Sequence, residues 1–458
     1  MKFVDFEALR SKIGSALFVD PVRLEEYRSD KSGSISSNRP SALVEARSVG
    51  DVQATLEFAN SEGIPVVPRG AGTGLAGGAI GDAGEIVLSM LKMNRVLEIS
   101  SQDLTAVVEP GVINAELNEQ LRTEGLWYSP DPASQAISTI GGNIATNAGG
   151  LLCAKYGVTR DSVLGLTVVL ADGQILKLGR RTVKGVTGLD LTSLIVGSEG
   201  TLAVIVEATL RLKPIRPDRE RTLVANFSDV VGAANAAARI TSSDLAPAVM
   251  EIMDEFSVGF VNDYLNPGSR EKAFSKLIVQ FDDQDADSRI ERATSLIGNT
   301  AVSVEVDRGA GESESLFAFR RAFHPALAAR GRVLIEDVAV PRSAMPAMFR
   351  EIQRISTEFE IPIPTVAHAG DGNLHPNFLV DSEGIPARVW DAASELFHSA
   401  LKLGGTLTGE HGVGTLKKRW LSEEIGDAQL DLQRRIKQVF DPRGILNPGK
   451  MFDERVHE

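Results

Sequence analysis

The sequence predicts an α+β protein of at least two domains with a short C-terminal segment. Its 458 residues are 43% hydrophobic, which is enough apolar material for more than one buried core. Short β-rich runs punctuated by glycine extend to about residue 215, and helical stretches then alternate with strands to about residue 410. Because this texture changes at "RLKPIRPDRERT", we expect domains over residues 1–216 and 217–415, followed by a segment over residues 416–458.

The first region begins with helices and continues with strands. Apolar spacing predicts helices in "FEALRSKIGSAL" and "SVGDVQATLEFANSEG", and the second ends at Gly63 before the strand "IPVVPR". The stretch "LTVVLADGQILKL" predicts a β-hairpin with a two-residue turn at Asp172 and Gly173.

The second region has the pattern of helices packed on an antiparallel sheet. We predict helices in "VVGAANAAARITSSD" and "PAMFREIQRISTEFE", and strands in "KLIVQFDD", "VSVEVD" and "VLIEDVAVP". The tail, "LQRRIKQVFDPRGILNPGKMF", predicts a helix and then a turn rich in proline and glycine.

Composition narrows the choice of partner and compartment. A formal net charge of −13 argues against nucleic acid or an anionic membrane as a partner. With Cys153 as the single cysteine, no intramolecular disulfide can form. The N-terminus lacks the apolar region of a signal peptide, and no apolar run reaches the roughly 20 residues of a membrane span. We therefore expect a soluble, cytoplasmic protein.

The stretch "PRGAGTGLAGGAIGDAGEIVLSM" contains a G-x-G-x-x-G pattern at Gly72, Gly74 and Gly77. A dinucleotide-binding Rossmann motif needs a helix to begin at the third glycine. Three further glycines follow Gly77 within seven residues, and the chain then enters a strand. We therefore predict strand, glycine loop and strand, which disfavours NAD and leaves a nest of backbone N–H groups for phosphate.

Two more glycine-rich segments lie in the same region, "SPDPASQAISTIGGNIATNAGG" at residues 129–150 and "VGSEGTL" at residues 196–202. One such segment is more often a tight turn than a ligand site. Three of them could line one long groove with backbone donors, which suits an extended dinucleotide such as FAD.

The second region carries a cluster of histidines. His368 and His375 in "HAGDGNLHPN" and Glu410 in "TGEHGVG" form the ligand set of an open Zn²⁺ or Mn²⁺ site, although isolated histidines are usually surface or core residues. The neighbouring His411 could act as a base. In "FAFRRAFHPAL", Arg320 and Arg321 lie on a predicted helix, as a solvated basic face or as a clamp for a carboxylate.

Together these segments resemble the flavin-dependent D-2-hydroxyacid dehydrogenases of the vanillyl-alcohol-oxidase superfamily. The likeness spans nearly the whole chain, and "PRGAGTGL", "GGNIATNAGG", "KYGVTRDSVLGL", "VGSEGTL", "HAGDGNLH" and "GEHGVG" occur in the family's order. The resemblance implies a two-lobed FAD-binding domain of the p-cresol methylhydroxylase (PCMH) type, a ferredoxin-like α+β cap domain, and a C-terminal helical segment that packs back on the FAD domain.

The resemblance also implies an FAD that is not covalently attached. Relatives with covalent FAD often carry a histidine near the place that Thr73 occupies here. The residues that it puts near FAD are Pro68, Arg69, Gly70, Ala71, Gly72, Thr73, Gly74, Pro132, Ser134, Gly141, Gly142, Asn143, Asn147, Gly149, Gly150, Gly197, Glu199, Gly200 and Asn447.

For the reaction, the resemblance assigns a role to each member of the histidine cluster. His368, His375 and Glu410 match metal ligands, and His411 matches the general base. Asn377 matches a substrate-contacting asparagine, and Arg320 matches the arginine that holds the substrate C1 carboxylate. The implied activity is oxidation of a D-2-hydroxy acid to the 2-oxo acid, with hydride passing to flavin N5.

The substrate is narrowed by two departures from the family pattern. Enzymes selective for D-2-hydroxyglutarate use a threonine and a lysine where this chain has His324 and Ile335. An apolar Ile335 cannot pair with a distal carboxylate, which favours D-lactate-like substrates unless Arg330 or Arg332 substitutes. D-2-hydroxyglutarate and glycolate stay as alternatives.

Two other classes of function are also considered. One is a metallohydrolase that uses the histidine cluster, and the other is a flavin-containing partner subunit of a larger complex. For the enzyme, the electron acceptor would be a quinone, a cytochrome, an electron-transfer flavoprotein or oxygen, and a homodimer or peripheral membrane association stays open.

Overall fold

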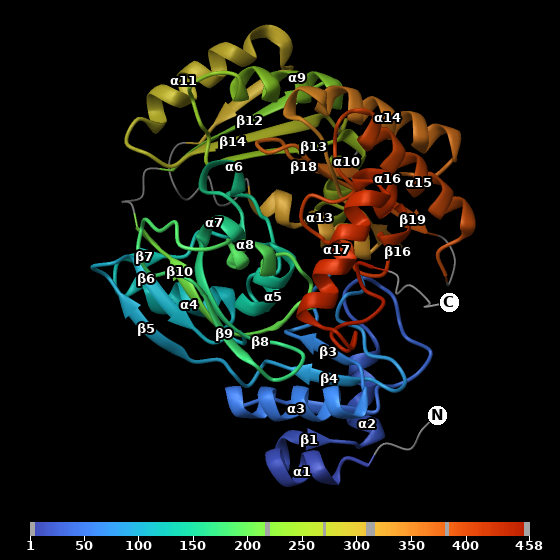
Figure 1. Ribbon diagram of the computed structural model, residues 1–458. Coiled ribbons are helices and arrows are strands. Elements are labelled where there is room, and N and C mark those ends of the chain that lie inside the picture. Colours follow the sequence, from blue (N-terminus) through green and yellow to red (C-terminus); the bar gives the residue numbers. More distant parts are fainter. Residues whose placement is uncertain (1–4, 216–219, 269–271, 308–316, 381–383, 453–458) are drawn as a thin grey trace. The chain divides into compact units, whose positions relative to one another are not determined.

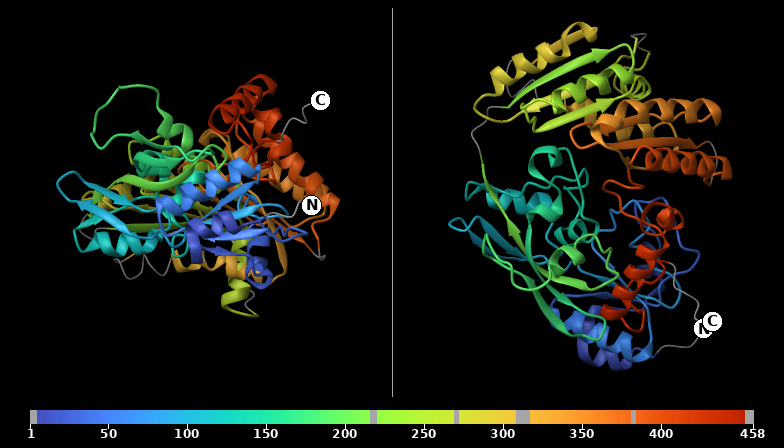
Figure 2. Two further views of the ribbon diagram at one scale, coloured as in Figure 1. Left: turned by 60° about the horizontal axis from the view of Figure 1, so that its bottom comes forward. Right: turned by 45° about the horizontal axis from the view of Figure 1, so that its top comes forward.

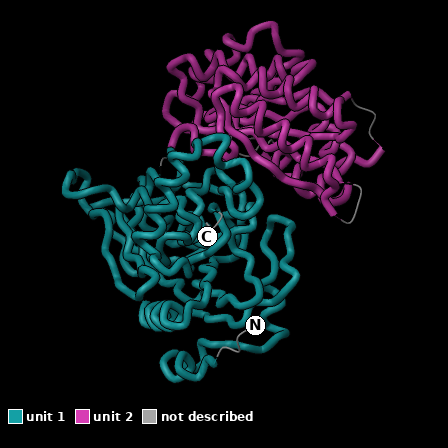
Figure 3. The backbone as a smooth tube through the Cα atoms, turned by 45° about the vertical axis from the view of Figure 1, so that its right-hand side comes forward, with its two compact units in different colours: residues 1–149, 157–215, 410–458 teal, residues 150–156, 216–409 magenta. Residues whose placement is uncertain are grey.

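The computed structural model describes residues 5–215, 220–268, 272–307, 317–380 and 384–452, which divide into two compact units (Figure 3). The first unit contains residues 1–149, 157–215 and 410–458, and the second contains residues 150–156 and 216–409. The domain boundary expected at residues 216 and 217 lies outside the described residues, and the three domain ranges stay a prediction.

The first unit begins with a small sheet of strand order β1-β2-β4-β3. In it β4 pairs in parallel with both β2 and β3, and β1 pairs with β2 in antiparallel fashion. The strands are β1 (Leu17–Phe18), β2 (Ala42–Glu45), β3 (Val66–Arg69) and β4 (Ile86–Ser89).

Helix α3 (Val49–Glu62) connects β2 to β3 and confirms the helix expected in this stretch. The side chain of Ser48 accepts a hydrogen bond from the backbone N–H of Asp51 at 3.2 Å, and Gly63 ends the helix with φ at 69°. Its buried face packs with the strands in one apolar cluster (Figure 1).

A second, antiparallel sheet completes the first unit, with strand order β5-β6-β10-β8-β9. The predicted hairpin is present between β8 and β9, but its turn differs. Leu170 pairs with Gln174, and the N–H of Gly173 donates to the carbonyl of Leu170 at 2.9 Å, so the loop contains three residues. The strands are β5 (Val96–Ser100), β6 (Thr105–Val108), β8 (Val163–Val169), β9 (Ile175–Gly179) and β10 (Val204–Arg211).

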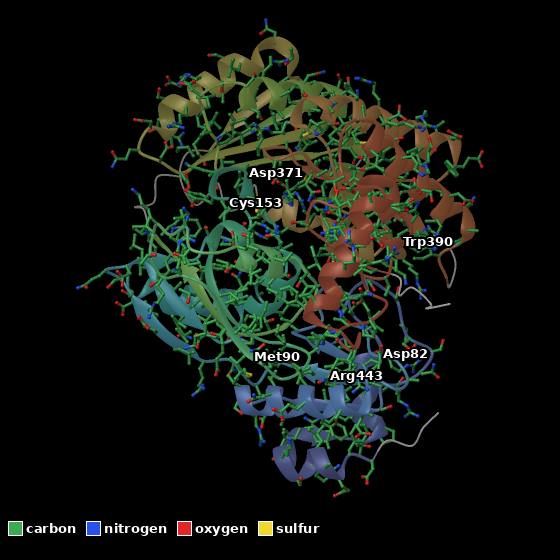
Figure 4. All side chains as sticks on the ribbon, in the orientation of Figure 1. Asp82, Met90, Cys153, Asp371, Trp390 and Arg443 are labelled. Carbon is green, nitrogen blue, oxygen red and sulfur yellow. The ribbon has the colours of Figure 1, made fainter. Side chains whose placement is uncertain are left out.

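The C-terminal segment belongs to the first unit. Helix α17 (Asp427–Phe440) confirms the predicted tail helix, and Leu446 then forms a parallel bridge with Val66 of β3. Arg443, labelled in Figure 4, donates to the carbonyl of Ser61 at 3.3 Å near the end of α3. The tail is therefore held against the small sheet.

The second unit is built on one antiparallel sheet of order β15-β12-β14-β13-β18-β19-β16, with β17 beside β19. Its first half has the chain order strand, helix, strand, helix, strand, helix, strand, in which α10 (Glu255–Leu265) is an addition between β13 and β14. Helices α9 and α11 contact each other and β12 (Figures 1 and 2). This is the ferredoxin-like arrangement that the sequence predicts. These elements are β12 (Arg221–Phe227), α9 (Val230–Thr241), β13 (Val249–Met253), β14 (Ser275–Phe281), α11 (Ala286–Ile297) and β15 (Ser303–Val306).

The second half of the sheet differs from the prediction at one point. "VLIEDVAVP" does not form a single strand but two, β16 (Arg332–Ile335) and β17 (Val338–Ala339), and Asp337 lies between them. The side chain of Asp337 instead accepts hydrogen bonds from Thr408 and from the N–H of Gly409, at 2.8 and 2.7 Å.

The remaining elements complete, connect or cover these sheets. In the first unit they are α1 (Glu7–Ile13), α2 (Pro21–Leu24), α4 (Asn114–Arg122), β7 (Leu126–Trp127), α5 (Ile140–Thr146), α7 (Thr159–Ser162), α8 (Leu191–Ile195), β11 (Lys213–Pro214) and α16 (Leu421–Ile425). In the second they are α6 (Cys153–Tyr156), α10 (Glu255–Leu265), α13 (Phe323–Ala328), α14 (Met345–Glu358), β18 (Thr365–His368), β19 (Asn373–Val380) and α15 (Ala387–Lys402). Among the described helices, none combines the length and the apolar character that crossing a membrane requires.

Candidate functional site

The glycine-rich stretch of the first unit runs from β3 to β4 as a loop without a helix. This confirms the strand, loop and strand prediction. The guanidinium of Arg69 holds the loop, because its Nη1 donates to the carbonyls of Ser29 and Ala79 at 2.8 and 2.6 Å. A Cβ on Gly70 would lie 2.4 Å from Oγ1 of Thr139, so this loop packs closely against the second glycine-rich segment.

The second glycine-rich segment contains the N-terminus of α5. Oγ1 of Thr139 accepts a hydrogen bond from the N–H of Gly142 at 3.1 Å and caps this short helix. A Cβ on Gly141 would lie 2.5 Å from Cβ of Pro110. Close packing inside the first unit therefore explains the glycines at positions 70 and 141.

Two predicted cofactor residues of this segment make internal hydrogen bonds. Nδ2 of Asn143 donates to Oγ of Ser138 at 3.2 Å. Oδ1 of Asn147 accepts from the N–H of Arg160 at 2.9 Å, and Asn147 itself adopts a left-handed conformation. These two asparagines shape the backbone around the loops.

Glu199, in the third glycine-rich segment, fastens the C-terminal part of the chain. It is buried, and its carboxylate accepts hydrogen bonds from the N–H groups of Val413 and Gly414 at 2.7 and 2.8 Å. Nδ2 of Asn447 donates to the carbonyls of Glu199 and Gly78, at 2.7 and 3.0 Å. The glycine segments and the tail are thus neighbours within the first unit.

Most of the other predicted cofactor residues lie in these same loops. Ala71, Gly72, Thr73 and Gly74 are half-buried, and a Cβ on Gly200 would lie 3.3 Å from Pro68. Gly150 belongs to the second unit. The rest are in the first unit, namely Pro132, Ser134, Gly149 and Gly197.

Strand register gathers the predicted polar residues of the second unit on one face of its sheet. His368 pairs with Glu251 of β13, and His375 pairs with Val366 in β18. On the other side of β19, Asn377 pairs with Ile335. Because directly paired residues point to the same face, and so do residues two apart, Glu251, both histidines, Asn377 and Ile335 share it.

His368 and Arg320 share one acid on this face, and His375 lies against His368. The rings of His368 and His375 lie edge to face, with centroids 4.9 Å apart. Oε1 of Glu251 lies 2.6 Å from Nδ1 of His368, and Nε of Arg320 donates to Oε2 of Glu251 at 2.9 Å. All four side chains are buried, so the structure brings this part of the predicted site together.

Asn377 offers an acceptor to this cluster. Its Nδ2 donates to the carbonyls of His375 and Pro364, at 2.7 and 3.3 Å. Its Oδ1 is buried and has no hydrogen-bond partner among the described residues. A buried amide oxygen of this kind is what a bound polar ligand would satisfy.

Glu410 and His411 begin the return of the chain to the first unit. Glu410 directly follows Gly409, whose N–H is held by Asp337 of the second unit. Within the first unit, a Cβ on Gly149 would lie 2.7 Å from Oε2 of Glu410, so Gly149 leaves room for this carboxylate.

Glu251 and Asp337 were not predicted from the sequence. Both are fully buried acids, and each stands inside an apolar strand-like run, "VMEIM" and "VLIEDVAV". Such an acid needs a partner in the folded protein, so this pattern was the available signal. The partners themselves lie far away in the sequence.

The chain matches two protein families. Residues 40–179 match the FAD binding domain, and residues 216–451 match the family described as FAD linked oxidases, C-terminal domain. Together the two ranges cover parts of both units.

Two relatives are similar over almost their whole length. The chain is 41% identical to the glycolate oxidase subunit GlcD of Bacillus subtilis over 423 residues, which cover 90% of this chain and 89% of that protein. It is 36% identical to the D-lactate dehydrogenase of Archaeoglobus fulgidus over 435 residues, which cover 93% of this chain and 95% of that protein.

Solved structures share the fold at low identity. p-Cresol methylhydroxylase superposes with a TM-score of 0.79 at 18% identity, covering 97% of this chain and 95% of that one. For 4-ethylphenol oxidase from Gulosibacter chungangensis the TM-score is 0.76 at 20% identity, covering 99% of this chain and 97% of that one. These likenesses confirm the predicted fold class.

Glu199 makes the stability of the protein depend on pH. Burial raises its pKa to about 7, against the two backbone N–H groups and Lys417, which lower it. The folded state therefore keeps a proton that the unfolded state releases above about pH 4.5, and stability falls as pH rises towards 7. Relative to the wild type, we expect the free energy of unfolding of Glu199→Gln to rise by about 3 kcal/mol as the pH goes from 4.5 to 8. One pKa unit corresponds to about 1.4 kcal/mol.

Thermal unfolding of both proteins across this pH range measures the effect. Groups that titrate in both proteins cancel in the difference between their melting temperatures. If the melting temperatures of the two proteins differ by the same amount at every pH, Glu199 is ionised throughout. The N–H groups of Val413 and Gly414 would then outweigh the effect of its burial.

Proposed function

Because the chain belongs to the family of FAD-linked oxidases, we propose that it oxidises a D-2-hydroxy acid, with D-lactate favoured, to the 2-oxo acid. The observation that carries this proposal is the buried group of His368, His375 and Arg320. Asn377 is on the same face, and its Oδ1 has no hydrogen-bond partner among the described residues. The names of the two relatives above contain glycolate and lactate, and both of these are 2-hydroxy acids. D-2-hydroxyglutarate and glycolate are the alternative substrates, and the flavin family leaves no support for a metallohydrolase.

The glycine loops of the first unit are proposed to hold FAD without a covalent bond. Between Gly70 and Gly74 the loop is half-buried and presents successive backbone N–H groups, as a pyrophosphate requires. An added Cβ on Gly74 meets no described atom within 4 Å, so there is open space beside the loop. Bound FAD would supply the acceptor for a hydride from the substrate carbon.

His368, His375 and Glu410 are proposed to hold a divalent metal, Zn²⁺ or Mn²⁺. Two imidazoles and a carboxylate suit such an ion, and Glu410 is one peptide bond from the anchored Gly409. A bound cation would lower the pKa of the substrate hydroxyl.

The other side chains are proposed to bind the substrate and take its proton. Arg320 uses Nε for Glu251, and its two terminal nitrogens form the fork that receives the C1 carboxylate. Oδ1 of Asn377 orients the substrate from the same face. His411 accepts the hydroxyl proton as the general base.

Electrons then leave for an external acceptor, which we propose to be a quinone, a cytochrome or an electron-transfer flavoprotein. The cytoplasmic location, the oligomeric state and any partner subunit stay predictions of the sequence.

Replacing His411 tests the proposed base. We expect His411→Ala to lower the rate of flavin reduction by D-lactate roughly 10²- to 10⁴-fold, the usual contribution of a general base. FAD content should be unchanged, because the loops that hold FAD keep their residues. His398→Ala on α15 is the control, and equal rates for the two variants would contradict the role of His411.

Ile335 tests the choice of substrate, because it lies opposite Asn377 in the β16–β19 pair. Ile335→Lys places a cation on the substrate-facing side of the sheet. We expect kcat/KM for D-2-hydroxyglutarate relative to D-lactate to rise ~10-fold, which corresponds to about 1.4 kcal/mol. Ile335→Leu keeps the apolar surface and should leave the ratio unchanged. A ratio that Ile335→Lys does not move would place the substrate's distal group elsewhere.

A further inference from the structure

Glu251 is a fully buried acid that contacts two residues of the proposed site at once. Its Oε2 accepts the hydrogen bond from Nε of Arg320 at 2.9 Å, and its Oε1 lies 2.6 Å from Nδ1 of His368. These partners are 69 and 117 residues away in the sequence. One carboxylate therefore joins the helical residues 317–321 to strand β18.

The contact with His368 decides which ring nitrogen is presented to a ligand. A carboxylate oxygen accepts, so Nδ1 of His368 carries the hydrogen and donates it to Glu251. The lone pair is then on Nε2, and the ring is held in one orientation. Histidines that bind metals are commonly fixed in this way by a carboxylate behind the ring.

The contact with Arg320 decides how its guanidinium is presented. The group is planar and rigid, so a hydrogen bond at Nε fixes the direction of both terminal nitrogens. Arg320 is buried as well, and the charge of Glu251 compensates its own. The fork is therefore oriented before a carboxylate arrives.

We propose that Glu251 is the positioning residue that sets both the carboxylate clamp and the first metal ligand. This inference rests on the proposed function and deepens it, because it makes one acid responsible for the geometry of substrate and metal together. Glu251 itself touches neither. Loss of its charge therefore removes the interaction that orients Arg320 and the one that orients His368.

A simpler role for Glu251 would be to neutralise an arginine, and at the end of β15 the buried Asp307 does this for the half-buried Arg221. Asp307 is buried, accepts from Nε of Arg221 at 2.8 Å and also accepts from the N–H of Thr222 at 2.8 Å. Its side-chain hydrogen bonds go to Arg221 and Thr222 of β12. Asp307→Asn therefore removes the ion pair of another buried carboxylate without touching the proposed site.

The experiment compares Glu251→Gln with Asp307→Asn in the FAD-loaded, full-length protein. In Gln an amide NH2 group replaces one carboxylate oxygen and faces the donor of Arg320 or of His368, whereas the shape of the side chain is kept. After metal removal, equilibrium dialysis against Zn²⁺ with elemental analysis gives the zinc affinity. We expect Glu251→Gln to lower it roughly 10- to 100-fold.

Substrate binding is measured on the same proteins at saturating Zn²⁺. We expect Glu251→Gln to raise KM for D-lactate roughly 10-fold, as for the loss of one hydrogen bond to a charged group, with a smaller change in kcat. Asp307→Asn should leave both zinc affinity and KM at wild-type values. If Glu251→Gln does not fold, Glu251→Asp keeps the charge but is too short to reach both partners, and it should show the same losses.

Two results would overturn the inference. If zinc affinity and KM change equally in Glu251→Gln and Asp307→Asn, Glu251 has only the structural role of an ion pair. A wild type that binds no Zn²⁺ would remove the metal site and the positioning role with it. A wild-type flavin that no 2-hydroxy acid reduces would instead refute the proposed function, so the failures are distinguishable.

Discussion

The site in the second unit depends on the antiparallel register of β13, β18, β19 and β16. Register alone aligns Glu251 with His368, and Asn377 with Ile335, on one face of the sheet. A shift of one residue in any of these strands would turn its polar side chains to the other face and bury them among apolar residues. Such a shift would leave buried charges without partners, so the polar residues that make up the site also oppose it.

In the first unit, irregular loops lie close together without regular backbone hydrogen bonding between them. Glycine permits the close approach, as at Gly70 beside Thr139. Buried polar groups then fix the loops: Arg69 binds two carbonyls, and Glu199 holds the N–H groups at the start of the C-terminal segment. In our proposal, the backbone N–H groups between Gly70 and Gly74 are the donors that would bind the cofactor.

Local signals in the sequence predicted those parts that depend on neighbouring residues. Ser48 and Gly63 bound helix α3 as expected, and the glycines after β3 excluded a Rossmann helix. The hairpin was predicted, but its loop is one residue longer because Gly173 takes a left-handed conformation after the turn. Glu251 was not predicted, because its partners come from distant strands and helices, and only the folded sheet shows which acid they share.

The visible absorption spectrum of the purified protein, recorded without oxygen before and after D-lactate is added, tests the central claim most directly. The account predicts flavin bands that D-lactate bleaches and L-lactate leaves intact, because Arg320, Asn377 and His411 would present only one face of the substrate carbon to the flavin. Flavin bands that survive D-lactate, D-2-hydroxyglutarate and glycolate alike would contradict oxidation of a D-2-hydroxy acid. So would a protein that shows no flavin bands and gains none with added FAD.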